Sequence, residues 1–287
     1  MSSQDSPLLE VQALMASLAE VAPNKPTACV GWTVHNISAH FAAATKEVAD
    51  LIELKVNHRR HRATLGFTER EAPFLALGDA DLGRALAAQG DRMAAAVFAL
   101  AESDDPAFEF TGRRFTVPQL STHVRSESAL HRWDIVGDDD ISEQLLTQAD
   151  LTRHAVDLLN TLPLLYEAPE WRAEHAGVTG RLRIVLRSPQ TADIVYEHTS
   201  EGARFEIAED GPVSGDAVVT TDVANRLLTI WGRRSAERPL TIDTDAISRA
   251  VVESVLWGAG LPWSPGRSAI SGSHQPWRNL TSDGGAV

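Results

Sequence analysis

Residues 122–134, with the sequence THVRSESALHRWD, determine how the rest of the chain is interpreted. Read as an α-helix, this stretch places Glu127 and His131 four residues apart on one face, with about 6 Å between their Cβ atoms. A carboxylate and an imidazole that project side by side can hold a divalent metal ion, but a third ligand must then come from another part of the chain. The best candidate is His40, on an earlier amphipathic stretch.

The helix that carries this pair is predicted to run from about 117 to 136. Thr116 and Pro118 are typical of a helix start, and Gly137 is typical of a helix end. A buried, ionised glutamate is costly unless it is paired or binds a metal. The alternative interpretation is that Glu127 forms an ion pair with a residue of another helix. His123, one turn before Glu127, is a rival metal ligand that we rank below His131. One face of the helix contains Leu120, Val124, Glu127, His131 and Ile135.

His40 belongs to a second predicted helix, which begins near Thr33. Thr33 is a suitable N-cap, and Asn36 three residues later nearly completes a capping box. By itself, a histidine at the edge of an apolar stripe is more often a core residue that hydrogen-bonds to backbone than a metal ligand. That stripe consists of Ile37, Phe41, Ala44, Val48 and Leu51.

The first 168 residues contain long amphipathic helices joined by short connections, which predicts an antiparallel four-helix bundle. In such bundles, metal sites are built from inward side chains on facing helices. Phe108 to Val117 alternates weakly and is interpreted as a small hairpin. Ser142 is expected to cap the last long helix. Further helices are predicted over 7–22, 80–101 and 143–167.

The second half of the chain changes to short alternating strands followed by helices, which predicts a small α+β domain. We therefore expect an α+β chain with a bundle domain over 1–170, an α+β domain over 171–262 and a loosely ordered tail over 263–287. Strands are predicted over 181–186, 194–196, 204–207, 217–220 and 240–242, and helices over 223–231 and 246–257.

Composition excludes several classes of protein. The formal net charge is −13, which argues against nucleic-acid binding because phosphate contacts need clustered cations. The short basic run at 58–62 is interpreted as a solvated helix end. No stretch of about 18 apolar residues is present, and the N-terminus lacks the features of a signal peptide. The single Cys29, interpreted as a small buried hydrophobe, fits a cytoplasmic protein.

Three groups of residues resemble the mycothiol-dependent maleylpyruvate isomerase family. They are Gly31-Trp32-Thr33-Val34 followed by His40, the Glu127-x-x-x-His131-Arg132-x-Asp134 stretch, and residues 217–220 with 227–233. The resemblance covers roughly residues 8 to 258. It implies a DinB-like metal-binding four-helix bundle, followed by a sterol-carrier-like domain. It also implies that His40, Glu127 and His131 hold a divalent metal, most often Zn²⁺, and that mycothiol is the co-substrate.

Three protein ligands leave one position of a catalytic zinc site open. A thiol that binds there is deprotonated outright, and the thiolate is the nucleophile. Asp134 is a candidate to hold a ligand imidazole in place, with a helix-end carboxylate as the alternative. Arg233 and Arg70 are similar to arginines that the family uses near its cleft, where they would bind carboxylates. Ordinary surface arginines are the alternative for both.

We therefore expect an enzyme, a metal-dependent mycothiol S-transferase that attaches the thiol to an electrophilic small molecule. Related members act in detoxification and in antibiotic pathways, including thiol exchange on a lincosamide intermediate. The chain is longer than compact isomerases, and its segment 58–80 differs from them, which favours transfer. The alternatives are a maleylpyruvate cis–trans isomerase, an Fe(II) oxygenase with the same two-histidine, one-carboxylate ligand set, and a non-enzymatic lipid-binding protein.

Overall fold

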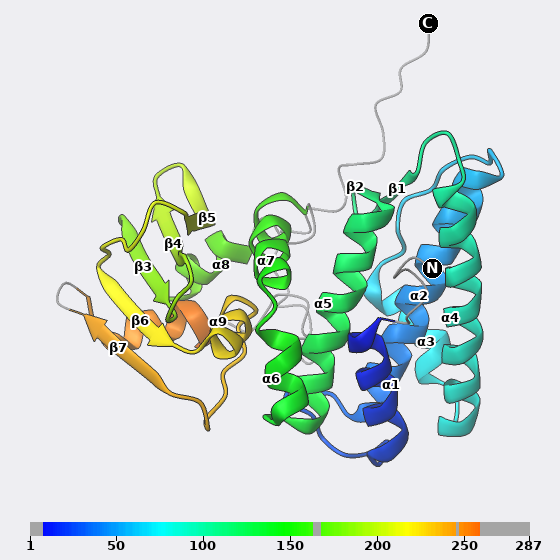
Figure 1. The fold of residues 1–287 in the computed structure, drawn as a ribbon, viewed down its shortest axis with the longest axis horizontal. Coiled ribbons are helices and arrows are strands. Elements are labelled where there is room, and N and C mark those ends of the chain that lie inside the picture. The colour runs from blue at the N-terminus through cyan, green and yellow to red at the C-terminus, as the bar shows by residue number, and fades with distance from the viewer. Residues whose placement is uncertain (1–7, 163–167, 245–246, 259–287) are drawn as a thin grey trace, which may run out of the picture.

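The computed structural model describes residues 8–162, 168–244 and 247–258. The helices α1 to α5 and the main sheet occupy opposite ends of an elongated molecule, with α6 and α7 between them and α8 and α9 beside the sheet (Figure 1). This arrangement confirms the predicted α+β class, with helices first and the sheet second. The first half consists of α1 (Leu9–Glu20), α2 (Val34–Val56), α3 (Phe67–Leu75), α4 (Asp79–Ala101), β1 (Ala107–Phe110), β2 (Arg113–Thr116), α5 (Val117–Val136), α6 (Asp140–Leu146), α7 (Ala149–Thr161) and α8 (Ala168–His175).

The two helices that carry the predicted ligands begin at the expected positions. The Asn36 side chain accepts a 2.9 Å hydrogen bond from the Thr33 backbone N–H at the start of α2. At the start of α5, the Gln119 side chain accepts a 2.9 Å hydrogen bond from the Thr116 N–H in the same way. Helix α2 packs along α4, and α1 packs along α5. These four helices form the bundle that the sequence predicts.

The long helix predicted over 143–167 is wrong, because the chain breaks after Leu146 into α6 and α7. At the break, the Gln148 side chain donates to Glu10 of α1 at 2.9 Å and to the Leu145 carbonyl at 3.0 Å. The predicted cap is also wrong, since Asp139 precedes α6 and accepts the N–H of Ser142 at 2.7 Å. Helices α3 and α8 were not predicted. The end of the predicted helix, at 163–167, and the tail over 263–287 lie outside the described residues.

The second half forms a five-stranded sheet with the order β5-β4-β3-β6-β7. Only β3 and β6 run parallel, and α9 follows β6 before the chain returns antiparallel in β7. Each predicted strand is present, and the last predicted helix continues from α10 into a π-helical turn over Ser254–Gly258. The elements are β3 (Leu182–Arg187), β4 (Asp193–Thr199), β5 (Gly202–Ala208), β6 (Ala217–Thr221), α9 (Val223–Ile230), β7 (Leu240–Thr244) and α10 (Arg249–Glu253).

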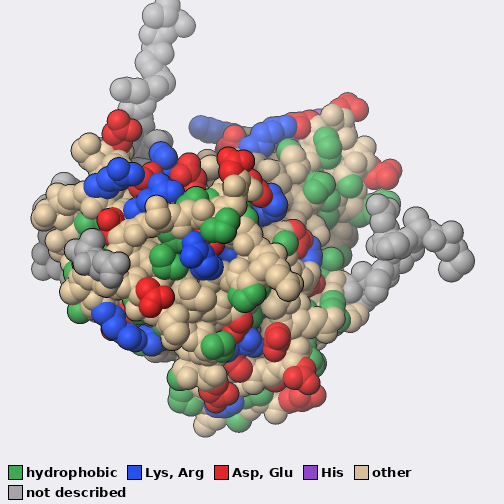
Figure 2. Space-filling view, turned by 60° about the vertical axis from the view of Figure 1, so that its left-hand side comes forward, with side chains coloured by type: hydrophobic (Ala, Val, Ile, Leu, Met, Phe, Trp, Pro, Cys, Tyr) green, Lys and Arg blue, Asp and Glu red, His purple; other side chains and the backbone are tan. Residues whose placement is uncertain are grey.

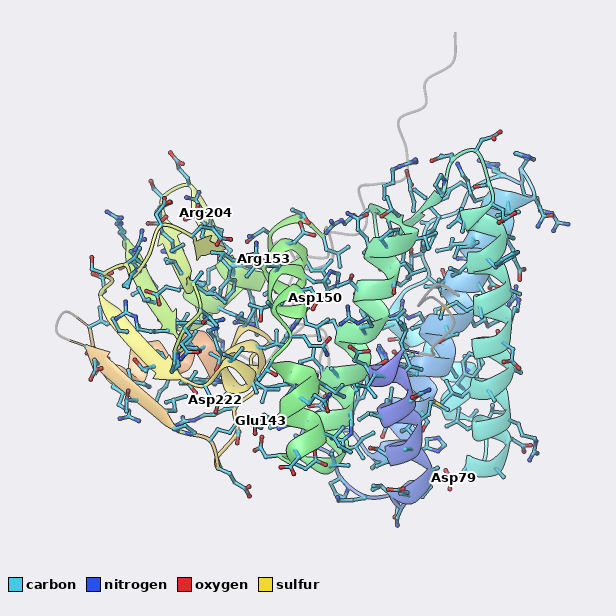
Figure 3. All side chains as sticks on the ribbon, in the orientation of Figure 1. Asp79, Glu143, Asp150, Arg153, Arg204 and Asp222 are labelled. Carbon is cyan, nitrogen blue, oxygen red and sulfur yellow. The ribbon has the colours of Figure 1, made fainter. Side chains whose placement is uncertain are left out.

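One continuous apolar core joins the bundle to the sheet, because α7 contacts both β5 and α9. Polar contacts reinforce this junction. Asp138 accepts hydrogen bonds from Trp133 Nε1 at 3.0 Å and from Arg238 Nε at 2.6 Å. Arg238 also lies 3.9 Å from Glu143 on α6 and 3.4 Å from Asp222, and Figure 3 labels these two acidic residues. The C-terminal end of α5 is therefore fixed against the second half of the chain.

Charged side chains of both signs are interspersed over the face shown in Figure 2. The basic run at 58–62 does more than end a helix in solvent, because the Arg62 guanidinium donates to both oxygens of buried Glu47. In the described part of the chain, no helix is both long enough and apolar enough to cross a membrane.

Candidate metal centre

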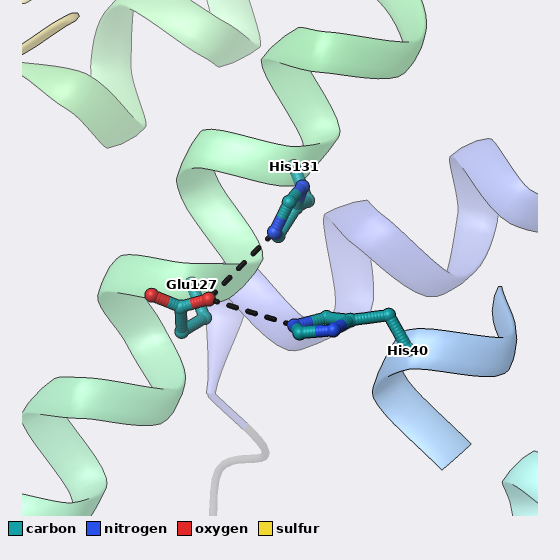
Figure 4. Close-up of side chains that lie close together, drawn as sticks. All are labelled: His40, Glu127 and His131. Atoms are coloured by element: carbon teal, nitrogen blue, oxygen red, sulfur yellow. Dashed lines mark ion pairs between the residues drawn. The ribbon is translucent and has the colours of Figure 1, made fainter. Parts of the chain in front are cut away.

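Side chains from α2 and α5 converge at the position that the sequence predicts (Figure 4). One potential ligand atom from each of His40, Glu127 and His131 lies within 4.8 Å of the others. Glu127 Oε2 is 4.0 Å from His40 Nε2 and 3.7 Å from His131 Nε2. Both histidines are largely buried, whereas 27% of the Glu127 side chain is exposed, so the group is open to solvent on the glutamate side.

The other ring nitrogen of each histidine faces a carboxylate. His40 Nδ1 is 2.7 Å from Glu71 Oε1, and His131 Nδ1 is 2.9 Å from Asp134 Oδ2. A carboxylate beside Nδ1 favours the proton on that nitrogen, which leaves the lone pair on Nε2. Both Nε2 atoms therefore face Glu127 as acceptors suited to a cation. Asp134 lies where the sequence predicted, whereas Glu71 was not predicted as a partner.

Aromatic rings surround the two imidazoles. Trp32 stacks on His131 with a ring separation of 5.8 Å and an angle of 3°, and Phe67 stacks on His40 at 6.1 Å. Phe41 meets the His131 ring edge-on at 5.5 Å. These contacts restrict the orientation of both rings, which keeps their Nε2 atoms directed at the same point.

The electrostatics of the group favour a negative Glu127 next to a positive charge. Burial raises the pKa of Glu127, but the neighbouring histidines, chiefly His40, outweigh this effect in their protonated forms and lower the pKa. For His40, burial lowers the pKa, while Glu127 and Glu71 raise it by a larger amount. The carboxylates that stabilise the protonated imidazole are the same groups that would attract a cation.

Arg233 reaches the centre from the second half of the chain and pairs with Asp134. Its Nε and Nη2 donate to the two oxygens of Asp134 at 2.8 and 2.7 Å. Burial opposes ionisation of Asp134, yet the arginine charge and its hydrogen bonds, together with His131, hold the pKa of Asp134 at about 2. His131, Asp134 and Arg233 thus form one chain of polar contacts, with Arg233 bound behind His131 rather than directed at it.

The backbone around Arg233 is fixed by three features. Its N–H donates to the Leu228 carbonyl at 2.8 Å, and its carbonyl accepts from Trp257 Nε1 at 3.0 Å. Gly232 adopts a φ of 72° just before it, in the left-handed region that favours glycine. The turn after α9 therefore presents the guanidinium in a defined direction.

Arg70 lies on α3 close to the same group and is almost fully buried. Its guanidinium carbon sits 4.2 Å from the centre of the Phe67 ring, and its Nε has no hydrogen-bond partner among the residues described. Burial lowers the pKa of Arg70, and the charges of Glu71, Glu47 and Glu127 oppose this effect. A buried guanidinium with an unused donor is suited to bind the carboxylate of a small molecule.

Cys29 lies in the loop before α2. Burial and the charges of Asp134 and Glu127 raise the pKa of its thiol to about 11, although Arg233 opposes the shift. The thiol is therefore protonated at neutral pH and is not activated as a nucleophile. A thiol reaction at this centre needs sulfur from another molecule.

The rival ligand His123 does not join the group. Its Nδ1 lies 3.3 Å from His154 Nε2 on α7, and its ring packs 5.6 Å from Phe115. Burial lowers the pKa of both histidines, and the neighbouring His123 lowers that of His154 further, to about 4. This pair is neutral at physiological pH and forms part of the packing between α5 and α7.

The His123–His154 pair predicts a loss of stability in acid. The folded pKa of His154, about 4, lies below the ordinary value of 6.5, so its stabilisation is complete above pH 6.5 and is lost as the pH falls toward 4. When the pH is lowered from 7 to 4.5, protonation linked to His154 should lower the free energy of unfolding by roughly 2 kcal/mol. The test is urea unfolding of the metal-free protein at the two pH values. His154→Leu should lose less unfolding free energy between pH 7 and 4.5 than the wild type does, by about this amount. The exposed His61→Leu serves as the control, and an unchanged loss in His154→Leu would contradict the assignment.

Comparison with known proteins finds a family that resembles the first part of the chain. Residues 9–136, from α1 to the end of α5, match the family model described as the mycothiol maleylpyruvate isomerase N-terminal domain. This part of the chain is therefore similar to the N-terminal domain of a family that is named for a mycothiol-dependent enzyme. The match contains all three residues of the candidate metal centre, together with Glu71 and Asp134.

Two solved structures are similar to most of the chain. Both are crystal structures of the mycothiol-dependent maleylpyruvate isomerase, one of them of a histidine-to-alanine mutant. The TM-scores are 0.53 for the mutant and 0.52 for the other, with 17% sequence identity over 84% of this chain and 96% of theirs. At this identity the likeness shows a shared fold that extends through both halves. None of the curated proteins matched the chain.

Proposed function

We propose that this protein is a metal-dependent S-transferase that uses mycothiol and attaches its sulfur to an electrophilic small molecule. The observation that carries the proposal is the convergence of His40, Glu127 and His131 within 4.8 Å. Three protein ligands leave a further position of a divalent metal free for a thiol. The family match of residues 9–136 supports mycothiol as that thiol.

The donor set fits a zinc ion. Two imidazole Nε2 atoms and one carboxylate are typical of catalytic zinc sites with an open position, and both Nδ1 atoms already have carboxylate partners. When bound, the metal would lower the pKa of the incoming thiol and so supply a thiolate at neutral pH. The same donors also suit the Fe(II) of oxygenases. Metal analysis of the purified protein and a measurement of oxygen uptake distinguish the two, since the S-transferase consumes no oxygen.

The surrounding residues would bind and orient the reactants. Arg70, with an unused donor beside the centre, would bind a carboxylate of the electrophile. Trp32 and Phe67 pack on the ligand imidazoles and limit the access of water. In the reaction, the sulfur forms a new bond to carbon while the leaving group departs with its bonding electrons. The thiol proton passes to solvent.

The pairing of Arg233 supports transfer over isomerisation. A dicarboxylate such as maleylpyruvate is bound most simply by two free cations, but Arg233 already holds both oxygens of Asp134. Arg70 is then the arginine at the centre with an unused donor in the described structure. The second candidate is nevertheless the maleylpyruvate cis–trans isomerase, because the family match names that enzyme and the shared fold spans 96% of its chain.

The lipid-binding alternative receives little support from the second half of the chain. A cleft beside β5, about 700 Å³ in volume, has five charged or polar residues in its lining, which is not the predominantly apolar lining typical of a lipid pocket. These residues are Asn160, Glu170, Glu201, Arg204 and Glu206. If His131→Ala left lipid binding as the only measurable property, this alternative would be favoured again.

The proposal is tested by incubating the zinc-loaded protein with mycothiol and a panel of electrophiles, including monocarboxylates and maleylpyruvate. Mass spectrometry should detect a conjugate whose mass equals that of mycothiol plus the electrophile, minus the leaving group and the thiol hydrogen. Conversion of maleylpyruvate to its trans isomer without consumption of mycothiol would support the second candidate. Neither product across the panel, with metal bound, would contradict both.

A further inference from the structure

We propose that Glu71 is a positioning residue of the metal centre, which fixes Nε2 of His40 as the nitrogen that binds the metal. The inference rests on the proposed metal-dependent function. Its basis is the 2.7 Å contact between Glu71 Oε1 and His40 Nδ1, made across 31 residues of sequence by α3 folding back onto α2. About 11% of each side chain is exposed, so water competes little for this hydrogen bond.

The role follows from the hydrogen-bonding capacity of the two groups. A neutral imidazole has one N–H donor and one acceptor, whereas an ionised carboxylate only accepts. Glu71 therefore holds the proton on Nδ1 of His40 and leaves the Nε2 lone pair directed at Glu127, 4.0 Å away. Asp134 Oδ2 lies 2.9 Å from Nδ1 of His131 as an ion-pair contact. Each ligand histidine is thus backed by a carboxylate, and the one behind His40 comes from a helix outside the four-helix bundle.

Zinc affinity separates a positioning role from a purely structural ion pair. Loss of a carboxylate behind a ligand histidine typically weakens metal binding by about 10- to 100-fold. Competition with a chromogenic chelator should show this loss in Glu71→Ala and a smaller loss in Glu71→Gln, whose amide oxygen accepts the same hydrogen bond without the charge. Glu69→Gln changes the charge of an exposed side chain on the same helix and should bind zinc like the wild type.

The protonation of His40 provides a second measurement. In metal-free protein with ¹⁵N-labelled histidine, where no metal fixes the tautomer, long-range NMR correlations should place the proton of the neutral His40 on Nδ1 in the wild type and in Glu69→Gln. Glu71→Ala should lose this preference for the proton on Nδ1. If Glu71→Ala does not fold, the zinc affinity of Glu71→Gln decides the affinity test. Wild-type affinity and an unchanged His40 tautomer in a folded Glu71 variant would overturn this inference alone. Failure of the wild type to bind zinc would overturn the proposed function and the inference with it.

Discussion

Replacing His131 with alanine should lower conjugate formation at pH 7 by at least about 30-fold and release the metal. The magnitude follows from the ionisation of the thiol, since a free thiol with a pKa near 8.5 is only about 3% thiolate at pH 7. A centre that keeps the thiol ionised therefore gains about 30-fold in nucleophile before any effect of orientation. Removal of one of three ligands leaves too few donors to hold the ion in this geometry.

The pH dependence makes this prediction specific. The deficit of His131→Ala should shrink as the pH rises through 8.5, because solvent then ionises the thiol without help from the protein. Rates of conjugate formation from pH 6.5 to 9.5, together with metal content, provide the measurement. His123→Ala, on the same helix but outside the ligand group, should retain the metal and most of the activity. A full complement of metal in His131→Ala, or a deficit that does not vary with pH, would show that thiol activation has another origin.

The convergence of His40, Glu127 and His131 could be predicted because its parts are determined locally. The spacing of Glu127 and His131 fixes their common face once α5 is helical, and the caps at Thr33 and Thr116 fix where α2 and α5 begin. The apolar stripe beside His40 then indicates which side of α2 faces its neighbours. Two helices with inward polar residues in a small bundle have few other ways to pair them.

The partners of these residues could not be predicted in the same way. Glu71 meets His40 only because α3 folds back along α2, and the segment before α3 contains no periodic pattern that signals this return. The contact of Asp134 with Arg233 spans 99 residues and depends on how the sheet docks against α5 and α7. The sequence indicated that Asp134 and Arg233 belonged near the site, but it contained no signal that they bind each other, and it did not indicate Glu71 at all.

The break between α6 and α7 was missed for a related reason. Apolar residues recur at helical spacing through both helices, and nothing in that pattern marks Gln148 as a turn. Its side chain instead meets Glu10 on α1, a contact across 138 residues. Tertiary hydrogen bonds thus decide where this helix ends, in place of a glycine or proline that the sequence would reveal.

Replacing Arg233 with methionine should destabilise the protein by about 3–5 kcal/mol, the usual cost of leaving one partner of a buried ion pair uncompensated. The side chain of Asp134 is fully buried, and only 15% of the Arg233 side chain is exposed. The variant therefore leaves a desolvated carboxylate with only His131 to compensate its charge. Urea unfolding at pH 7 provides the measurement. Arg234→Met is the matched control. Arg234 is the next residue in the chain, but its side chain is exposed and pairs with Glu253 at 3.6 Å.

A second substitution shows whether the cost arises from the unpaired charge. Removing both charges of a buried pair is far less destabilising than removing one, so Arg233→Met combined with Asp134→Asn should recover much of the lost stability. If Arg233→Met destabilises the protein only because the arginine side chain no longer packs, the double variant should recover no stability. The double variant should still bind zinc more weakly than the wild type, because an uncharged amide at this position supports the His131 imidazole less well than a carboxylate does. Full stability in Arg233→Met alone would mean that the second half of the chain does not hold Asp134 in place.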